Sequence, residues 1–393
     1  IRPISIDFVA GSKLAPAAVE PRPHIFLFVI DSLRPDYLSP YNPAVGFTPR
    51  IAGFAAESIV FRNAFTRYGG TGLSVPSIWA GSVIPHKQYV QPFQPMNALD
   101  KLLEANGYRK WLSLNAITAE LLGRGASFDE LDRGRPEMEF AFCRTAGEIE
   151  RKLQISPPAQ PIFVDLLPQD LHVARVRGGS VPAGESYPGF DAPYASRVHQ
   201  IDGCFGAFVD TLKRLGLYDR SLIVLTADHG EHLGEDGRWG HSYYMTPEVI
   251  QVPLMVHLPA RVPAAPAARA ADPDAISFLT DITPTIYGAL GYQPVAANAF
   301  MGNPLVGADA DILRQRRRGS YVLAASYGAV YAVVRRNGHR LYIADAVNGG
   351  DRAYERGADG RWTELSMTDT TRMVNQLLIR RHIDALRELY RIS

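Results

Sequence analysis

Only two of the 393 residues are cysteines, Cys143 and Cys204. Neither has the spacing of a metal-binding motif, and two ordinary buried thiols are favoured over the one disulfide that this pair allows. The chain also lacks an apolar run long enough to span a bilayer. It begins at Ile1 rather than at methionine, so a signal or a membrane tether upstream of residue 1 stays open.

Neither sign of charge is in excess, since Lys and Arg number 41 and Asp and Glu 40, for a net charge of +1. This balance gives no electrostatic basis for binding nucleic acid or a strongly anionic surface. The Gly-x-Ser-x-Gly motif of a cofactor-free serine esterase is missing as well. A hydrophobic fraction of 46% is typical of a globular protein with a full core, either one large domain with an appendage or two domains.

Short apolar runs alternate with amphipathic segments along most of the chain. The run from Ile25 to Ile30 has the continuous apolar character of a central parallel strand that is buried on both faces. Segments of helical period separate the apolar runs, and this order is typical of an α/β sheet. Further strands are predicted at 59–65, 111–115, 161–167, 221–226 and 252–258.

The two ends of the chain differ from this pattern. Residues 1–23 mix proline, alanine and single charges without a period, which predicts a linker or an N-terminal arm. From about residue 306, strand-like runs joined by tight turns precede a final helix at about 370–390. The predicted organisation is therefore an arm at 1–23, a catalytic domain at 24–305 and a small antiparallel subdomain at 306–393.

The most informative polar residues follow the predicted strand at 221–226. Asp228 and His229 lie where this strand ends, and the carboxyl ends of parallel strands face the binding crevice of an α/β sheet. A carboxylate beside an imidazole is a ligand pair that suits zinc or manganese. A glycine-rich loop follows and leads to His241. The alternative for the pair is a plain helix cap with surface charges after it.

Other strand ends offer side chains of the same kind. Asp31 ends the first strand, and Asp170 and His172 follow the strand at 161–167. Thr71 lies between glycines ahead of a predicted helix start, where backbone N–H groups and the helix dipole favour an anionic oxygen. Each of these residues taken alone is more often a helix cap or a satisfied core residue than a ligand.

Together these side chains can surround one divalent ion. The predicted ion is zinc or manganese, and the predicted ligands are Asp31, Thr71, Asp228 and His229. Such an ion would lower the pKa of the Thr71 hydroxyl and make it a nucleophile without a dedicated base. His241 and His172 would then stabilise phosphoryl oxygens or protonate the leaving group.

At these residues the chain resembles the sulfatase and alkaline phosphatase superfamily, and within it the phosphoethanolamine transferases and lipoteichoic acid synthases. The segment Asp31-Ser-Leu-Arg-Pro-Asp36 is similar to the acidic end of the first strand in that branch, with Asp in place of the usual Glu. The segment Thr71-Gly-Leu-Ser-Val-Pro76 has the branch's spacing from a nucleophilic threonine to Ser-Val-Pro. The Asp-His-Gly-Glu block at 228–231 and the later histidine at 241 are similar to its metal-binding and substrate-side residues.

This resemblance implies an alkaline-phosphatase-like α/β/α sandwich with a largely parallel central sheet and a small C-terminal antiparallel subdomain. It also implies a metal-dependent phosphotransferase or phosphodiesterase in which Thr71 forms a covalent phosphothreonine. The substrate would be a phosphate or sulfate ester, including esters linked to a lipid or a glycan. The resemblance favours a periplasmic or extracytoplasmic enzyme, with or without a membrane anchor, and a cytoplasmic location stays open.

Two alternatives stay open. The first is a true sulfatase, in which Ser74 is the modified nucleophile and calcium or magnesium is the metal. Ser74-Val-Pro-Ser77 is similar to the sulfatase motif, but Ile78 stands where that motif has arginine, and Ser32 and His241 stand where sulfatases have an acid and a lysine. These departures favour a phosphoryl-type site. The second alternative is a catalytically silent domain that binds glycans or envelope polymers.

Overall fold

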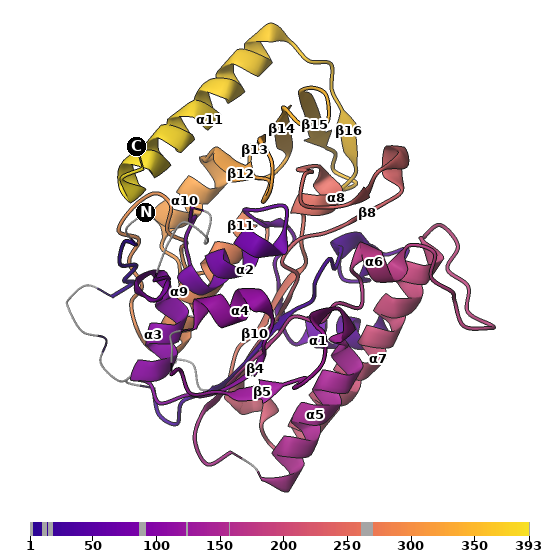
Figure 1. The fold of residues 1–393 in the computed structure, drawn as a ribbon, viewed down its shortest axis with the longest axis vertical. Coiled ribbons are helices and arrows are strands. Elements are labelled where there is room, and N and C mark those ends of the chain that lie inside the picture. The colour runs from indigo at the N-terminus through magenta and orange to yellow at the C-terminus, as the bar shows by residue number, and fades with distance from the viewer. Residues whose placement is uncertain are drawn as a thin grey trace.

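The computed structural model describes residues 3–9, 14, 19–85, 92–122, 125–156, 158–260 and 270–392. Two layers of helices enclose a seven-stranded sheet, and a separate five-stranded sheet with one long helix lies at one end (Figure 1). The predicted fold class, an α/β/α sandwich with a largely parallel central sheet and a small antiparallel sheet, is confirmed.

The central sheet has the strand order β2-β10-β7-β1-β6-β4-β5. Its strands, in that order, are β2 (Ile59–Val60), β10 (Leu254–His257), β7 (Ser221–Thr226), β1 (His24–Val29), β6 (Ile162–Leu166), β4 (Arg109–Ser113) and β5 (Asp129–Leu131). Strand β1 pairs in parallel with both β6 and β7, whereas β10 runs antiparallel to β7 and β2. Every residue of β1, β6 and β7 is buried, which explains the continuous apolar runs in their sequences.

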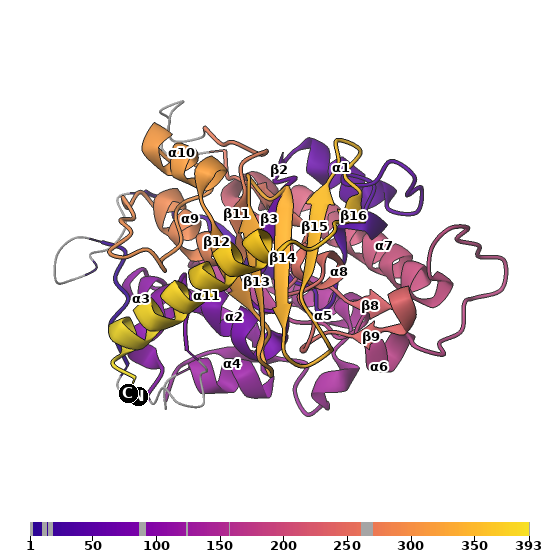
Figure 2. The ribbon, with the colours of Figure 1, turned by 90° about the horizontal axis from the view of Figure 1, so that it is seen from above.

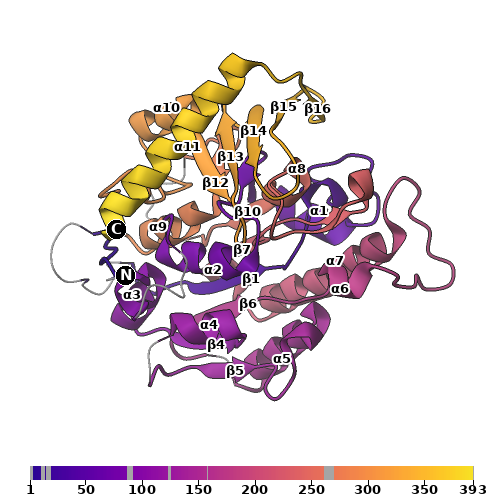
Figure 3. The same ribbon diagram turned by 45° about the horizontal axis from the view of Figure 1, so that its top comes forward.

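Helices cover both faces of this sheet (Figure 3), and aromatic side chains pack them against it. Phe28 of β1 meets Phe205 edge to face at a ring-centroid distance of 5.7 Å, and Phe163 of β6 meets Trp79 at 5.6 Å on the other face. The first face carries α1 (Pro49–Ala56), α5 (Phe142–Ile155) and α7 (Ala192–Arg214). The second carries α2 (Thr71–Ala80), α3 (Ala98–Ala105), α4 (Ala116–Leu121) and α9 (Ile282–Ala289).

The five-stranded antiparallel sheet follows α10 (Ala310–Arg318). Its strands are β12 (Tyr321–Ala324), β13 (Val330–Arg335), β14 (Arg340–Asp345), β15 (Arg352–Arg356) and β16 (Trp362–Glu364), and α11 (Asp369–Tyr390) crosses its outer face (Figure 2). The backbone of Gly69 donates a hydrogen bond to Ala324 O at 3.1 Å, so β12 joins the chain just ahead of α2. The division into domains at residue 305 remains a prediction.

One local prediction needs revision. The single strand expected at 59–65 is two short strands, because β2 pairs with β10 while β3 (Ala64–Phe65) pairs with β11 (Ser277–Phe278) in another sheet. In the predicted arm at 1–23, Ile6 and Phe8 are buried in the core, and residues 1–2, 10–13 and 15–18 lie outside the described residues. Across the described ranges, no helix has the length and apolar character that crossing a membrane requires.

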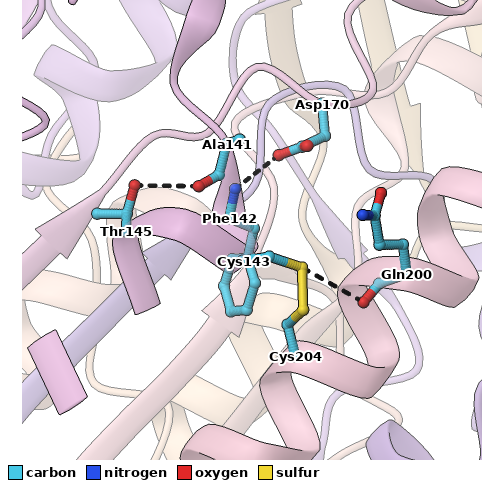
Figure 4. Close-up of a disulfide and its surroundings, with 7 residues drawn as sticks. All are labelled: Ala141, Phe142, Cys143, Thr145, Asp170, Gln200 and Cys204. Atoms are coloured by element: carbon cyan, nitrogen blue, oxygen red, sulfur yellow. Dashed lines mark hydrogen bonds between the residues drawn. A yellow bond between two sulfur atoms is a disulfide. The ribbon is translucent and has the colours of Figure 1, made fainter. Parts of the chain in front are cut away.

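The expectation of two free thiols is wrong. Cys143 of α5 and Cys204 of α7 form a disulfide with a Cα–Cα distance of 5.2 Å (Figure 4). The two helices pack side by side, and their half-buried cysteines face each other across a separation of 61 residues. Proximity across two helices leaves no spacing signal in the sequence, so composition alone could not distinguish the disulfide from a pair of thiols.

The short elements near the site complete the fold. They are α6 (Val173–Val176), β8 (His232–Leu233), β9 (Trp239–Gly240) and α8 (Pro247–Ile250). The hairpin of β8 and β9 carries the glycine-rich loop that the sequence predicts, with Gly234 at φ 107° and Gly240 at φ 92°, in the left-handed region that favours glycine.

Candidate active site

Strand register brings the first acidic residues together. Val29 of β1 pairs with Thr226 of β7, so Asp31 and Asp228 each lie two residues beyond a matched pair at the same sheet edge. On the other side of β1, Gln169 follows β6 at the same level and donates from Nε2 to Asp31 Oδ2 at 3.2 Å. Parallel pairing therefore places side chains from three strand ends at one point.

Asp31, Asp228 and His229 form a compact, buried cluster. One ligand atom from each lies within 4.8 Å of the others, and none of the three residues is more than 1% exposed. The ring of His229 lies against Gly230 O, with Nδ1 at 2.8 Å, which fixes Nδ1 as the donor and leaves the lone pair of Nε2 facing the cluster. Nε2 lies 3.3 Å from Asp228 Oδ2.

Thr71 reaches this cluster from the opposite direction. It is the first residue of α2, so its hydroxyl lies at a helix N-terminus, and Gly70 precedes it in an extended conformation. Thr71 Oγ1 lies 3.2 Å from Asp31 Oδ2 and 3.0 Å from His229 Nε2. The structure thus brings all four predicted ligand residues together.

The donor set fits a divalent cation. Oδ2 of Asp228 is buried and accepts no hydrogen bond from any residue that the structure describes, although a buried carboxylate oxygen normally has a partner. Burial raises the pKa of Asp228 to about 7. Burial would also raise the pKa of Asp31, but the imidazoles of His229, His241 and His172 outweigh it and lower that pKa. A cation would supply the partner and the charge that these two carboxylates require.

Ser74 has a different environment from Thr71. Its side chain is completely buried, and Oγ donates to the backbone oxygen of Asp228 at 2.6 Å. It also lies 3.0 Å from the hydroxyl of Thr66. Ser74 therefore ties the first turn of α2 to the loop after β7, one turn away from the cluster that Thr71 faces.

Two further imidazoles extend from His229 of the cluster. The ring centroid of His241 is 4.0 Å from that of His229 and 5.3 Å from that of His172. His241 Nδ1 lies 3.0 Å from Glu231 Oε1, and burial raises the pKa of Glu231 to about 7 and lowers the pKa of His241. His172 Nδ1 accepts from the backbone of Ala174 at 3.2 Å, so its Nε2 carries the hydrogen.

A strained turn holds the acidic side of the site. Ser32 adopts φ 63°, which is uncommon for a residue other than glycine, and its hydroxyl bonds Asp31 Oδ1 at 2.7 Å and Glu231 Oε2 at 3.1 Å. The hydroxyl of Tyr194 donates to Ser32 O at 2.7 Å and accepts from Arg34 N at 2.8 Å. The turn is thereby fixed on both sides, and Ser32 links two carboxylates.

The one arginine in the motif after β1 faces the protein. Arg34 is 6% exposed, and its guanidinium bonds Asp36 at 2.7 Å, Glu235 at 2.5 Å and Glu231 O at 3.0 Å. These carboxylates hold the pKa of Arg34 above its ordinary value against the cost of burial. Arg34 therefore fastens the loop after β7 to the end of β1.

One predicted candidate lies apart from the cluster. Asp170 Oδ2 accepts from the backbone N–H of Phe142 at 2.8 Å, at the start of α5 (Figure 4). The other candidates, Thr71, Asp31, Asp228, His229, His241 and His172, are brought to one place. Sequence reasoning missed the contributions of Gln169, Ser32 and Glu231. The sequence offered a signal for Glu231, because this residue belongs to the Asp-His-Gly-Glu block. No motif in the sequence pointed to Gln169.

The strand order, the helix layers and the acid–imidazole cluster at the sheet edge define an alkaline-phosphatase-like α/β protein with a site suited to a metal ion. The sulfatase family model matches residues 23–292. This chain belongs to the sulfatase family.

Individual relatives match part of their length. The N-acetylglucosamine-6-O-sulfatase of Bacteroides thetaiotaomicron is 26% identical over 155 residues, covering 39% of this chain and 27% of that protein. This chain matches between 13% and 27% of the length of the curated relatives.

Solved structures of the fold match over nearly the whole chain. BT4656 in complex with D-glucosamine-2-N,6-O-disulfate has a TM-score of 0.66 at 15% identity, covering 94% of this chain and 98% of that one. The lipoteichoic acid synthase LtaP from Listeria monocytogenes has a TM-score of 0.57 at 15% identity, covering 94% and 90%. At these identities the likeness shows the fold.

Proposed function

We propose that this protein is a metal-dependent phosphotransferase or phosphodiesterase in which Thr71 is the nucleophile. The observation that carries the proposal is the position of Thr71 Oγ1, 3.2 Å from Asp31 Oδ2 and 3.0 Å from His229 Nε2 at a helix N-terminus. Backbone N–H groups there favour negative charge on the hydroxyl oxygen and on a phosphoryl group beside it.

Asp31, Asp228 and His229 would hold the ion, with Thr71 completing the donor set. When bound, zinc or manganese supplies Lewis-acid chemistry, polarising a phosphoryl oxygen and lowering the pKa of the neighbouring hydroxyl. Ser32 and Gln169 fix the two oxygens of Asp31 through bonds of 2.7 Å and 3.2 Å, so this carboxylate is held in one orientation.

The chain's own residues carry the transfer. Thr71 loses its proton to solvent, and its oxygen forms a bond to phosphorus while the bond from phosphorus to the departing alcohol breaks. His241 passes a proton from Glu231, whose pKa burial raises to about 7, to the departing oxygen, and the Nε2–H of His172 donates to a phosphoryl oxygen. A hydroxyl or water then attacks the phosphothreonine and gives its proton through His241 to Glu231, while the bond from phosphorus to Thr71 breaks and Thr71 Oγ1 regains a proton from solvent.

The contrast between Thr71 and Ser74 tests the proposal. Substitution Thr71→Ala should lower kcat/KM for a phosphodiester such as bis(p-nitrophenyl) phosphate by at least about a thousand-fold, because it removes the hydroxyl that lies 3.2 Å from Asp31 Oδ2 and 3.0 Å from His229 Nε2. Wild-type protein quenched during turnover should carry a phosphoryl-containing adduct on Thr71 by peptide mass spectrometry. Activity close to wild type in Thr71→Ala would refute the assignment.

Ser74→Ala is the matched control. It removes a hydroxyl in the same helix turn and should lower activity only about ten-fold or less, through a looser Asp228 loop. A true sulfatase would instead show the mass loss of a serine oxidised to formylglycine at Ser74, and would turn over p-nitrophenyl sulfate. Two of the relatives are sulfatases, which supports this alternative. The hydrogen-bonding contacts of Ser74 with Thr66 and with the backbone of Asp228 weigh against it.

A catalytically silent, polymer-binding domain is the second alternative. The complete set of ligands and the unpartnered Asp228 Oδ2 weigh against it, since a silent domain has no need to bury two carboxylates side by side. Metal analysis of the purified protein distinguishes the metal-dependent enzyme from the silent domain, because a silent domain is expected to bind no divalent ion.

We also propose an oxidising location for the protein. The disulfide between Cys143 and Cys204 is of a kind that persists in secreted and periplasmic proteins and is rare in the cytosol. This supports the periplasmic or extracytoplasmic location that the family resemblance favours.

A further inference from the structure

Three large apolar side chains are exposed together near the site. Tyr243, Tyr327 and Val347 are 46%, 51% and 50% exposed, although they come from three separate turns. The rings of Tyr243 and Tyr327 lie with centroids 6.3 Å apart at an angle of 52°. A Cβ placed on Gly328 would lie 3.0 Å from Tyr243 Cδ1 and 3.1 Å from Val347 Cγ2, so the three form one surface, here called the aromatic rim.

The aromatic rim adjoins the proposed nucleophile. A Cβ placed on Gly72 would lie 2.5 Å from the hydroxyl oxygen of Tyr327, so this hydroxyl reaches the residue directly after Thr71. Burial, with smaller contributions from Tyr243 and the charge of Asp228, raises the pKa of the Tyr327 phenol. The hydroxyl of Tyr327 therefore lies beside the residue that follows Thr71, and its side chain is half exposed.

Backbone contacts fix the aromatic rim to the loop that carries Thr71. Ser326 Oγ donates to Gly70 O at 2.8 Å, and Ser326 N donates to Ser242 O at 3.2 Å. Ser242 N in turn donates to Gly69 O at 2.6 Å. The residues just before Tyr243 and Tyr327 are thus bound to the residues just before Thr71, and the rim keeps one distance from the nucleophile.

The chemistry of the aromatic rim suits a sugar ring. A tyrosine offers an apolar ring face and a hydroxyl at its edge, and two tilted tyrosines offer both to one ligand. A pyranose presents C–H groups on its face and hydroxyls on its rim, which matches this pattern. An acyl chain would be matched by aliphatic side chains, and Val347 alone is aliphatic here.

We propose that Tyr243, Tyr327 and Val347 form the subsite for the organic part of the ester, and that this part is a sugar ring. The inference rests on the proposed function, since it places a substrate beside Thr71. Isolated exposed hydrophobic residues need no explanation, but a contiguous group at the mouth of a reactive site is typical of ligand contact.

The test compares two methyl phosphodiesters, one of methyl glucoside and one of ethanol, with hydrolysis followed by ³¹P NMR. The metal-loaded wild type should prefer the glucoside by at least about ten-fold in kcat/KM, and Tyr243→Ala and Tyr327→Ala should each remove most of that preference. In both variants the loss of kcat/KM on the ethyl ester should be at least about ten-fold smaller than the loss on the glucoside. Tyr327→Phe separates ring contact from hydroxyl donation, and Met373→Ala, an exposed apolar residue of α11 outside the rim, is the control.

Binding separates this inference from the proposed function. Titration of methyl glucoside 6-phosphate into Thr71→Ala, by calorimetry, should give an affinity that falls about ten-fold or more when Tyr243→Ala and Tyr327→Ala are added. If the rim variants bind methyl glucoside 6-phosphate more weakly but the wild type hydrolyses neither ester, the proposed function is wrong and the subsite is supported. Turnover of both esters without any preference, or equal losses on both esters in the rim variants, would overturn the subsite and leave the proposed function standing.

Discussion

Asp165 tests how α2, the helix that begins at Thr71, is held against the sheet. Asp165 lies in β6 and is 7% exposed, and the indole Nε1 of Trp79 in α2 donates to its Oδ2 at 3.1 Å. Burial raises the pKa of Asp165 from 3.8 to about 7, and the bond from Trp79 only partly opposes this rise. The folded protein therefore keeps a proton on Asp165 where the unfolded chain has already lost it.

This difference sets the sign of the pH dependence. Between pH 3.8 and about 7 the folded state binds more protons at Asp165 than the unfolded state, so the free energy of unfolding falls as pH rises through this range. Each pKa unit corresponds to about 1.4 kcal/mol, which makes the total decline at most about 4 kcal/mol. Asp165→Asn keeps an acceptor oxygen for Trp79 and cannot titrate, so the variant should lack this decline.

Urea unfolding followed by tryptophan fluorescence at a series of pH values from about 4 to 8 measures the effect. The variant should match the wild type near pH 4 and become more stable by up to about 4 kcal/mol near pH 8. Glu364→Gln, in an exposed position of β16, is the control and should show no such trend. A difference between Asp165→Asn and wild type that stays constant with pH would refute the reasoning.

Two further changes probe the frame around the site. Replacing both Cys143 and Cys204 by Ala should lower the free energy of unfolding by about 4 kcal/mol in the chain-entropy estimate for a loop of 61 residues, and a loss under about 1 kcal/mol in urea titrations would contradict it. Tyr194→Phe should cost about 1–3 kcal/mol and at least about ten-fold in kcat, because it leaves Ser32 O and Arg34 N unpaired beside Asp31. Tyr41→Phe is its control, since the Tyr41 hydroxyl bonds only the backbone of Leu254, so equal losses of kcat in the two variants would argue against a positioning role for Tyr194.

Much of the site could be predicted because strand ends converge in a parallel sheet. Asp31 and Asp228 follow continuous apolar runs, and such runs in a parallel sheet share an edge whatever their separation in sequence. Thr71 was found by its glycine neighbours and by its spacing to Ser-Val-Pro. These features are local, so a single sequence carries them.

Contacts that depend on packing left no local signal. Gln169 reaches Asp31 only because β6 lies beside β1 in the sheet, and neither residue reveals that order. Tyr327 meets Gly72 only because the five-stranded sheet lies beside α2. The run at 59–65 contains two strands because its two ends pair with different strands, β10 and β11. Both partners lie far along the chain, and hydropathy does not reveal which strands pair.

The hydrogen bonds between the end of β12 and the loop before α2 affect which residues can change in a related protein without moving Thr71. The bonds from Gly69 to Ala324 and from Ser326 to Gly70 involve main chain or a small hydroxyl, so they place no demand on the side chain at 327. Under the proposed function, exchange of the side chain at 327 would change which esters are bound while Thr71 keeps its position. A protein that ended at residue 305 would lack both the side chain at 327 and the hydrogen bonds from Gly69 to Ala324 and from Ser326 to Gly70.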